Sequence, residues 1–200
     1  GLMWQGFYER VWFIRGMENT LIDIAINPDK LNKLLHAILN YHKKGIKKLA
    51  EAGVDGVFIT DDLGTQKGLM MSPNTFRKVI KPLYAELIDY VHNLGLNFWL
   101  HSCGNIFDII DDFIETGVDV LHPIQAGTMD YKQVAEKFAG RISFLVGFDV
   151  QHLLTEGSET EVRQGVREIV DIFQDPEGGL LLAAGNGILP GTPLENIRAF

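Results

Sequence analysis

The sequence has few cysteines and few basic residues for its 200 positions: one cysteine, Cys103, and 18 Lys and Arg against 26 Asp and Glu. A single cysteine excludes a disulfide within the chain and any zinc module built from several cysteines. The formal net charge of −8 disfavours a nucleic-acid or anionic-membrane partner, because either needs a basic face. No apolar run approaches the roughly 20 residues of a membrane span, and the first residues show no signal-peptide pattern. We therefore expect a cytoplasmic chain.

The chain is 46% hydrophobic and 22% charged, which is enough apolar material for a sizeable core. Short runs rich in Val, Ile, Leu and Phe predict five buried strands, at Val54–Thr60, Asn97–Cys103, Val118–Pro123, Ile142–Phe148 and Leu180–Ala184. Amphipathic stretches between them predict helices, at Pro28–Ala52, Pro73–Leu94, Ile106–Thr116, Tyr131–Phe138 and Glu159–Phe173. This alternation indicates an α/β fold with a parallel sheet. No linker composition interrupts it, so we expect a single domain over residues 1–200.

The predicted strands are too few for a closed (β/α)8 TIM barrel, which typically needs about 250 residues. The first segment is also apolar, with Trp4, Phe7, Trp12 and Phe13, and such side chains need neighbours to cover them. We therefore expect an incomplete barrel of about five parallel strands, part of a longer barrel that lacks its first strands. An open sheet edge invites pairing, so we expect either association with a second copy, as a homo-oligomer, or a missing remainder.

Polar residues follow the predicted strands at their carboxyl ends, where ligands bind in parallel α/β folds. The candidate catalytic acids at these ends are Asp61, Asp62 and Asp149. The candidate substrate-binding residues are Gln66, His122, Gln125, Gln151 and Asn186. Because these residues recur at the same end of successive strands, the sequence predicts a site there.

His101 and Cys103 are the candidate metal ligands. Residues two apart on a strand point to one face, about 6.5–7 Å apart, and rotation about χ1 can bring the imidazole nitrogen and the thiolate to a shared point. Imidazole and thiolate are preferred ligands of zinc, and Gly104 after them is expected to leave room for a substrate. The alternative is a core histidine with satisfied hydrogen bonds beside a small buried cysteine.

The acids and the second histidine each have two interpretations. Asp61 and Asp62 face opposite sides if the strand continues, so only one can enter the site. That aspartate could be a zinc ligand, a proton donor or an electrostatic anchor, or it could merely cap a helix. Asp149 either binds substrate or caps its loop. His122 shares the strand-end position, although a lone histidine is more often structural.

Further motifs extend the pattern: Arg15–Asn19, Ser72-Pro73, Pro82, Gly117–Asp119, Gly147–Asp149 and Gly187–Asn196. With Asp61–Gln66 and His101–Asn105, they make the sequence from about Glu9 to Phe200 resemble the uroporphyrinogen decarboxylase-like superfamily, which includes zinc-dependent cobalamin methyltransferases. The resemblance implies a (β/α)8 barrel in chains that are longer than this one, with the missing part at the N-terminus.

Two branches of this superfamily differ in their site residues. The resemblance implies that corrinoid methyltransferases bind zinc through an H-x-C pair, matched by His101 and Cys103, and through a later cysteine in a Gly-x-Gly region, where this sequence has Asn186. Uroporphyrinogen decarboxylases lack the H-x-C pair and carry a histidine at that Gly-x-Gly site and a tyrosine in an early helix, where this sequence has Asn186 and Trp12. Their arginine-rich segment and catalytic aspartate would precede Gly1. The sequence therefore departs from both branches.

The methyltransferase branch is favoured, because a substrate with eight carboxylates needs Arg or Lys and these strand ends offer acids and amides. The hypothesis is zinc-dependent methyl transfer between a corrinoid (cobalamin) and a small thiol, with a corrinoid protein as partner. Asp61 or Asp62, Asp149 or a water would complete the zinc shell. One alternative is a decarboxylase that acts on a tetrapyrrole in porphyrin biosynthesis. The other is a non-catalytic paralogue that binds a tetrapyrrole or a corrinoid.

Overall fold

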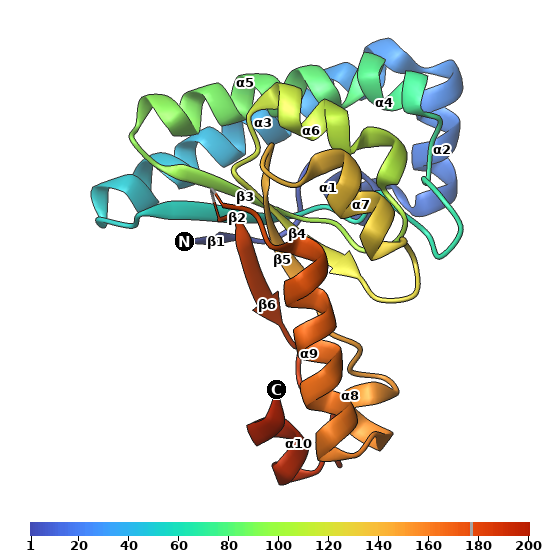
Figure 1. The fold of residues 1–200 in the computed structure, drawn as a ribbon. Coiled ribbons are helices and arrows are strands. Elements are labelled where there is room, and N and C mark those ends of the chain that lie inside the picture. The colour runs from blue at the N-terminus through green and yellow to red at the C-terminus, as the bar shows by residue number, and fades with distance from the viewer. Residues whose placement is uncertain (177) are drawn as a thin grey trace.

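A six-stranded parallel sheet forms the centre of the computed structural model, which describes residues 1–176 and 178–200 (Figure 1). The strands lie side by side in chain order: β1 Leu2–Met3, β2 Gly56–Thr60, β3 Asn97–His101, β4 Val120–Gln125, β5 Ser143–Gly147 and β6 Leu180–Ala183. Each new strand extends the same edge, as in an opened barrel. The expectation of about five strands missed β1, because two residues are too short to give a hydrophobic pattern.

Helices connect the strands, at α1 Tyr8–Arg15, α2 Met17–Ile26, α3 Pro28–Glu51, α4 Pro73–Val79, α5 Lys81–Asn93, η1 Phe107–Ile109, α6 Ile110–Thr116, α7 Tyr131–Phe138, α8 Leu153–Glu156, α9 Glu159–Phe173 and α10 Leu194–Ala199. The single helix predicted over residues 73–94 is two helices, α4 and α5. Pro82 lies in the first turn of α5, and because it has no N–H to bond back into α4, the helix restarts there.

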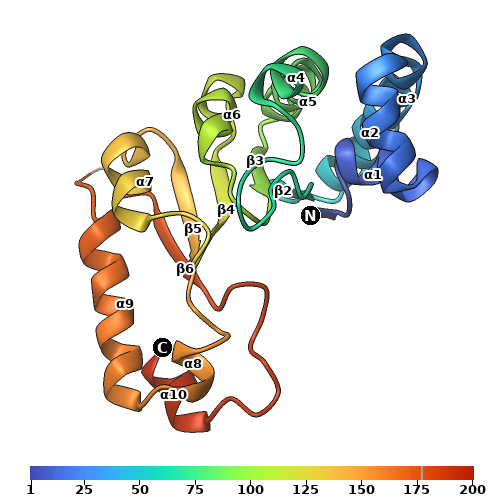
Figure 2. The same ribbon diagram turned by 90° about the vertical axis from the view of Figure 1, so that its right-hand side faces the viewer.

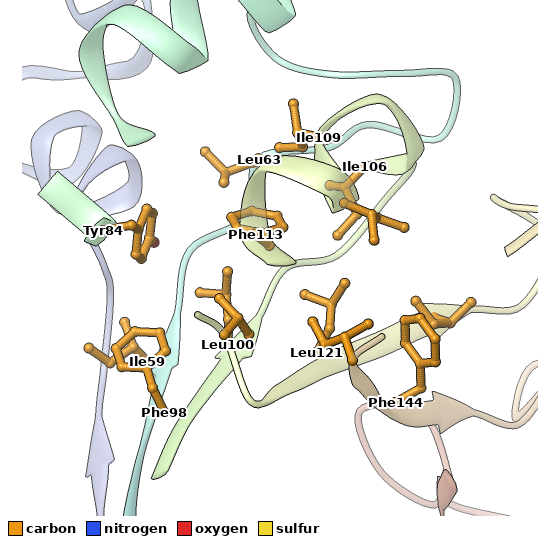
Figure 3. Close-up of a cluster of buried hydrophobic side chains, with 14 of the residues drawn as sticks. Ile59, Leu63, Tyr84, Phe98, Leu100, Ile106, Ile109, Phe113, Leu121 and Phe144 are labelled. Atoms are coloured by element: carbon orange, nitrogen blue, oxygen red, sulfur yellow. The ribbon is translucent and has the colours of Figure 1, made fainter. Parts of the chain in front are cut away.

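The main core lies between the sheet and the helices that cover one of its sides. The strand side chains in it are at most 2% exposed, and they include Ile59, Phe98, Leu100, Leu121 and Phe144. Tyr84 of α5 and Phe113 of α6 are fully buried and pack edge to face above these strand residues (Figure 3). This packing fixes each strand, and therefore also the loops at the strand ends.

The other side of the sheet is only partly covered. Figure 2 shows α3, α5, α6, α7 and α9 following one another around one side of the curved sheet. On the other side, Phe58, Trp99 and Leu145 line an open cavity of about 520 Å³. Trp4 is 63% exposed while Phe7 is fully buried. Only some of the apolar side chains of the first segment therefore lack neighbours that cover them. In the described parts of the chain, no helix has both the length and the apolar character to cross a membrane.

Candidate metal centre

The carboxyl ends of three neighbouring strands bring several of the predicted residues together. In the register of the sheet, Thr60 of β2 lies beside His101 of β3, which lies beside His122 of β4. Asp62 and Cys103 each follow by two residues, so their side chains return to the same face as the last strand residue. Asp62, in the loop after β2, and Cys103, in the loop after β3, therefore meet above the end of the sheet.

Asp62, His101 and Cys103 form a compact cluster at this end. One ligand atom from each lies within 4.8 Å of the other two. The Nε2 atom of His101 is 3.3 Å from the Cys103 Sγ atom and 3.4 Å from the Asp62 Oδ1 atom. The backbone N–H of Cys103 donates to the same carboxylate oxygen at 2.8 Å, which fixes the Asp62 side chain. The structure thus brings the imidazole and the sulfur of the H-x-C pair to a shared point.

The cluster perturbs the acidities of its members. Burial lowers the pKa of His101, but hydrogen bonds to Asp62 and Cys103 outweigh it and raise the pKa to about 9. Burial raises the pKa of Asp62, yet hydrogen bonds from His101 and from the Cys103 backbone outweigh it and lower that pKa. Asp62 is therefore a carboxylate at neutral pH, paired with an imidazolium, and a metal cation would take the place of the imidazolium proton.

The donor set fits a zinc ion. A carboxylate oxygen, an imidazole nitrogen and a sulfur are all zinc ligands, and three protein ligands leave a fourth position for a small molecule, as in catalytic zinc sites. Asn186 also reaches the cluster, with its Nδ2 atom 3.5 Å from the Cys103 Sγ atom. Because the Asn186 amide donates to this sulfur, it acts as a hydrogen-bond donor there and not as a ligand.

Asp61 points to the opposite side of the sheet, as the alternation of a strand predicts. Its fully buried carboxylate accepts hydrogen bonds from the backbone N–H groups of Phe7, Tyr8 and Glu9 and from the Tyr84 hydroxyl at 2.7 Å. The three N–H groups are the unpaired donors at the start of α1. The carboxylate of Asp61 therefore caps this helix and does not reach the cluster.

His122 and Gln125 of β4 support the cluster from beside it. His122 is 7% exposed, and its Nδ1 atom lies 2.8 Å from the Nδ1 atom of His101. The side-chain oxygen of Gln125 accepts a hydrogen bond from the Gly104 backbone at 2.9 Å. These contacts fix the imidazole and the loop that carry the candidate ligands.

A cavity of about 440 Å³ opens beside the Cys103 sulfur, between the ends of β4, β5 and β6. Besides Cys103, the predicted residues that line it are Gln125, Asp149, Gln151 and Asn186. Asp149 accepts hydrogen bonds from the backbone N–H groups of Gln151 and His152, so it caps its loop and also lines the cavity. The volume suits one small molecule. Among the described residues, the lining contains no Lys or Arg.

Gln66 and Gly104 differ from their expected roles. Gln66 is exposed in the loop after β2 and lies outside both the cluster and the cavity lining. Gly104 has a φ of +82°, and a Cβ atom there would lie 2.4 Å from the carbonyl carbon of Gly64. The expectation that Gly104 leaves room for a substrate is therefore wrong: its missing side chain instead allows two loop backbones to pack together, which places Cys103.

Glu9 of α1 is a further neighbour of the cluster, outside the site residues predicted from the sequence. Its carboxylate accepts hydrogen bonds from the Thr60 hydroxyl at 3.2 Å and from the Asp62 backbone. Burial, and then the charges of Asp61 and Asp62, raises the pKa of Glu9 to about 7. No local pattern marks this residue, because the contact joins positions 51 apart in the chain.

The family profile described as uroporphyrinogen decarboxylase (URO-D) matches residues 13–200. The chain belongs to the uroporphyrinogen decarboxylase family. Its curated relatives include a methylcobamide:CoM methyltransferase of Methanosarcina barkeri, which is 27% identical over 152 residues. They also include a uroporphyrinogen decarboxylase of Prochlorococcus marinus, which is 26% identical over 177 residues. The matches cover 76% and 86% of this chain but 41% and 47% of the relatives. The chain therefore spans about half the length of the curated relatives it matches.

The solved structure of a methyltransferase from Methanosarcina mazei has the same fold as this chain, with a TM-score of 0.75 and 21% sequence identity. The likeness covers 99% of this chain and 56% of the methyltransferase. The predicted fold class, a (β/α)8-type barrel present only in part, and the resemblance to the superfamily are confirmed. The described sheet has six strands where about five were expected.

Proposed function

We propose that this uroporphyrinogen decarboxylase family chain carries the zinc-binding part of a methyltransferase, which transfers a methyl group from a corrinoid to a small thiol. The observation that carries the proposal is the cluster of Asp62, His101 and Cys103 beside a cavity of small-molecule size. Relatives named as corrinoid methyltransferases support the same activity.

A bound zinc ion lowers the pKa of a coordinated thiol and supplies a thiolate at neutral pH. Asp62, His101 and Cys103 are the residues that would hold the ion, and Asn186 would donate a hydrogen bond to the ligand sulfur. In the transfer, a bond forms between the substrate sulfur and the methyl carbon while the bond from cobalt to carbon breaks. The electron pair stays on cobalt, and the thiol proton passes to solvent. A corrinoid is larger than the cavity, so it would dock over the cavity mouth, carried by a partner protein.

Uroporphyrinogen decarboxylation is the second candidate, because a relative with that name matches this chain to a similar extent. That substrate carries eight carboxylates and needs cationic side chains, whereas the described cavity lining holds one acid and three amides. A non-catalytic paralogue that binds a corrinoid or a tetrapyrrole is the third candidate. Asn186 is a weaker metal ligand than the cysteine or histidine that the two branches of the superfamily carry at this position. The charge of the cavity favours methyl transfer over decarboxylation.

Zinc content and turnover of the full-length protein separate these candidates. Protein purified without metal and then reconstituted is expected to bind stoichiometric zinc. The variants His101→Ala and Cys103→Ser are expected to lose it, and His36→Ala, which removes an exposed histidine of α3, is expected to retain it. Sub-stoichiometric zinc that is equal in all four proteins would refute the proposal.

Turnover is measured by the absorption change of a methylated corrinoid in the presence of a thiol. Loss of the methyl group with formation of a thioether supports the proposal. Conversion of uroporphyrinogen to coproporphyrinogen would support the decarboxylase instead. Binding of a corrinoid without turnover would support the paralogue.

A further inference from the structure

The contact between His101 and His122 defines where the protons of both rings lie. The two Nδ1 atoms are 2.8 Å apart, so one of them must carry a proton and the other must accept it. The Nε2 atom of His101 faces Cys103 and Asp62, and a metal ion in the cluster would need the lone pair of that nitrogen. The only ring proton of a metal-binding His101 would therefore lie on its Nδ1 atom, pointing at His122.

His122 must then be the acceptor, with its own proton on Nε2. The surroundings of His122 agree with this tautomer, because its ring also forms a hydrogen bond with the backbone of Gly185, where only the carbonyl oxygen can accept. The ring of Phe58 packs edge-on against His122, with the centroids 5.6 Å apart. His122 is therefore held from two sides in the orientation that receives the His101 proton.

This chain of contacts ends on the loop after β6. Gly185 bonds to His122, and the next residue, Asn186, places its amide 3.5 Å from the sulfur of Cys103. One loop thus contacts both the support of the imidazole ligand and the sulfur ligand. His122 is buried and absent from the lining of the cavity, so it is poorly placed for the substrate-binding role expected from the sequence.

On the basis of the metal site proposed above, we propose that His122 is a positioning residue, which fixes the metal-binding tautomer of His101 and connects the cluster to the Gly185–Asn186 loop. Hydrogen bonds from outside the ligand shell typically change metal affinity by about 10–100-fold. Substitution of His122 should therefore change the zinc affinity more than the free energy of unfolding.

Two variants of full-length protein test this role. His122→Phe keeps an aromatic ring and removes the acceptor, and is expected to weaken zinc binding by about 10–100-fold. His122→Asn places an oxygen close to the position of Nδ1, and is expected to restore zinc affinity to within roughly threefold of the unmodified protein. Zinc affinity is measured by competition with a chromophoric chelator. Thermal unfolding of the metal-free proteins shows whether each variant is folded.

Two spectroscopic measurements complete the test. In cobalt-substituted protein, His122→Phe is expected to shift the ligand-field bands and His122→Asn to leave them near their original position. Long-range proton–nitrogen NMR of the metal-free protein is expected to show the His122 proton on Nε2. Equal zinc affinity in the three proteins, or a proton on the Nδ1 atom of His122, would overturn this inference alone. Failure of the unmodified protein to bind zinc would overturn the proposed function and this inference together.

Discussion

Asp61 and Asp62 are adjacent in the chain, yet their carboxylates lie on opposite sides of the sheet and contact different structures. Asp61 accepts the backbone N–H groups at the start of α1, whereas Asp62 contacts the His101 imidazole and the Cys103 backbone. The acid at the end of β2, Asp61, therefore holds a helix in place, and the next residue, Asp62, is a candidate metal ligand. Substitution of each aspartate in turn should separate these roles.

Asp61→Ala is expected to destabilise the fold and to leave zinc affinity unchanged in the molecules that remain folded. The change removes a buried acceptor and leaves three backbone N–H groups and the Tyr84 hydroxyl without a partner, at a cost of about 2–5 kcal/mol in the free energy of unfolding. Urea unfolding measures this loss. A change below about 1 kcal/mol would show that water replaces the carboxylate and that the capping role is minor.

Asp62→Asn is expected to have the opposite effect. The Asp62 side chain is 43% exposed, so the free energy of unfolding should change by less than about 1 kcal/mol. Loss of the carboxylate should lower zinc affinity by more than about tenfold, because a neutral amide is a weaker ligand for zinc. Chelator competition measures this. The assignment of the ligand is wrong if Asp62→Asn binds zinc as the unmodified protein does while Asp61→Asn does not.

The positions of the site residues could be predicted where they depend on strand geometry alone. Alternation placed His101 and Cys103 on one face and separated Asp61 from Asp62. The common end of parallel strands placed Gln125, Asp149 and Asn186 near them. These inferences need only the period of a strand and the direction of the sheet.

Contacts that depend on packing between distant segments could not be predicted. Glu9 reaches the cluster because β1 pairs with β2, and a two-residue strand has no pattern of its own. The role of Gly104 depends on the close approach of Gly64 from another loop. Gln66 shares a motif with Asp62, but the loop turns it outward to solvent.

His42 of α3 is expected to make stability depend on pH. It is fully buried, and burial lowers its pKa to about 4. The unfolded state, with an ordinary histidine pKa near 6.5, binds more protons between these values. The stability linked to neutral His42 is therefore complete above about pH 6.5 and is lost as the pH falls toward 4.

The size of this effect is about 2 kcal/mol between pH 7 and pH 5. His42→Leu should remove that part of the pH dependence, whereas His36→Leu, at an exposed position of the same helix, should retain it. Urea unfolding at both pH values measures the difference. Identical pH profiles of His42→Leu and the unmodified protein would show that the pKa of His42 is the same in the folded and unfolded states, so that burial does not lower it.

Asn186→Cys is expected to tighten zinc binding by more than about tenfold, because it replaces an amide that donates to the Cys103 sulfur with a thiolate that zinc prefers as a ligand. The amide nitrogen already lies 3.5 Å from that sulfur, so a shorter side chain at this position stays close to the cluster. The measurement is chelator competition under reducing conditions, since two neighbouring thiols can otherwise form a disulfide. Asn186→Ala is the matched control and should bind zinc no more tightly than the unmodified protein, because it removes the hydrogen bond to the Cys103 sulfur without adding a ligand. If Asn186→Cys and Asn186→Ala bind zinc equally, the loop after β6 does not approach the metal, and the shell is completed from elsewhere.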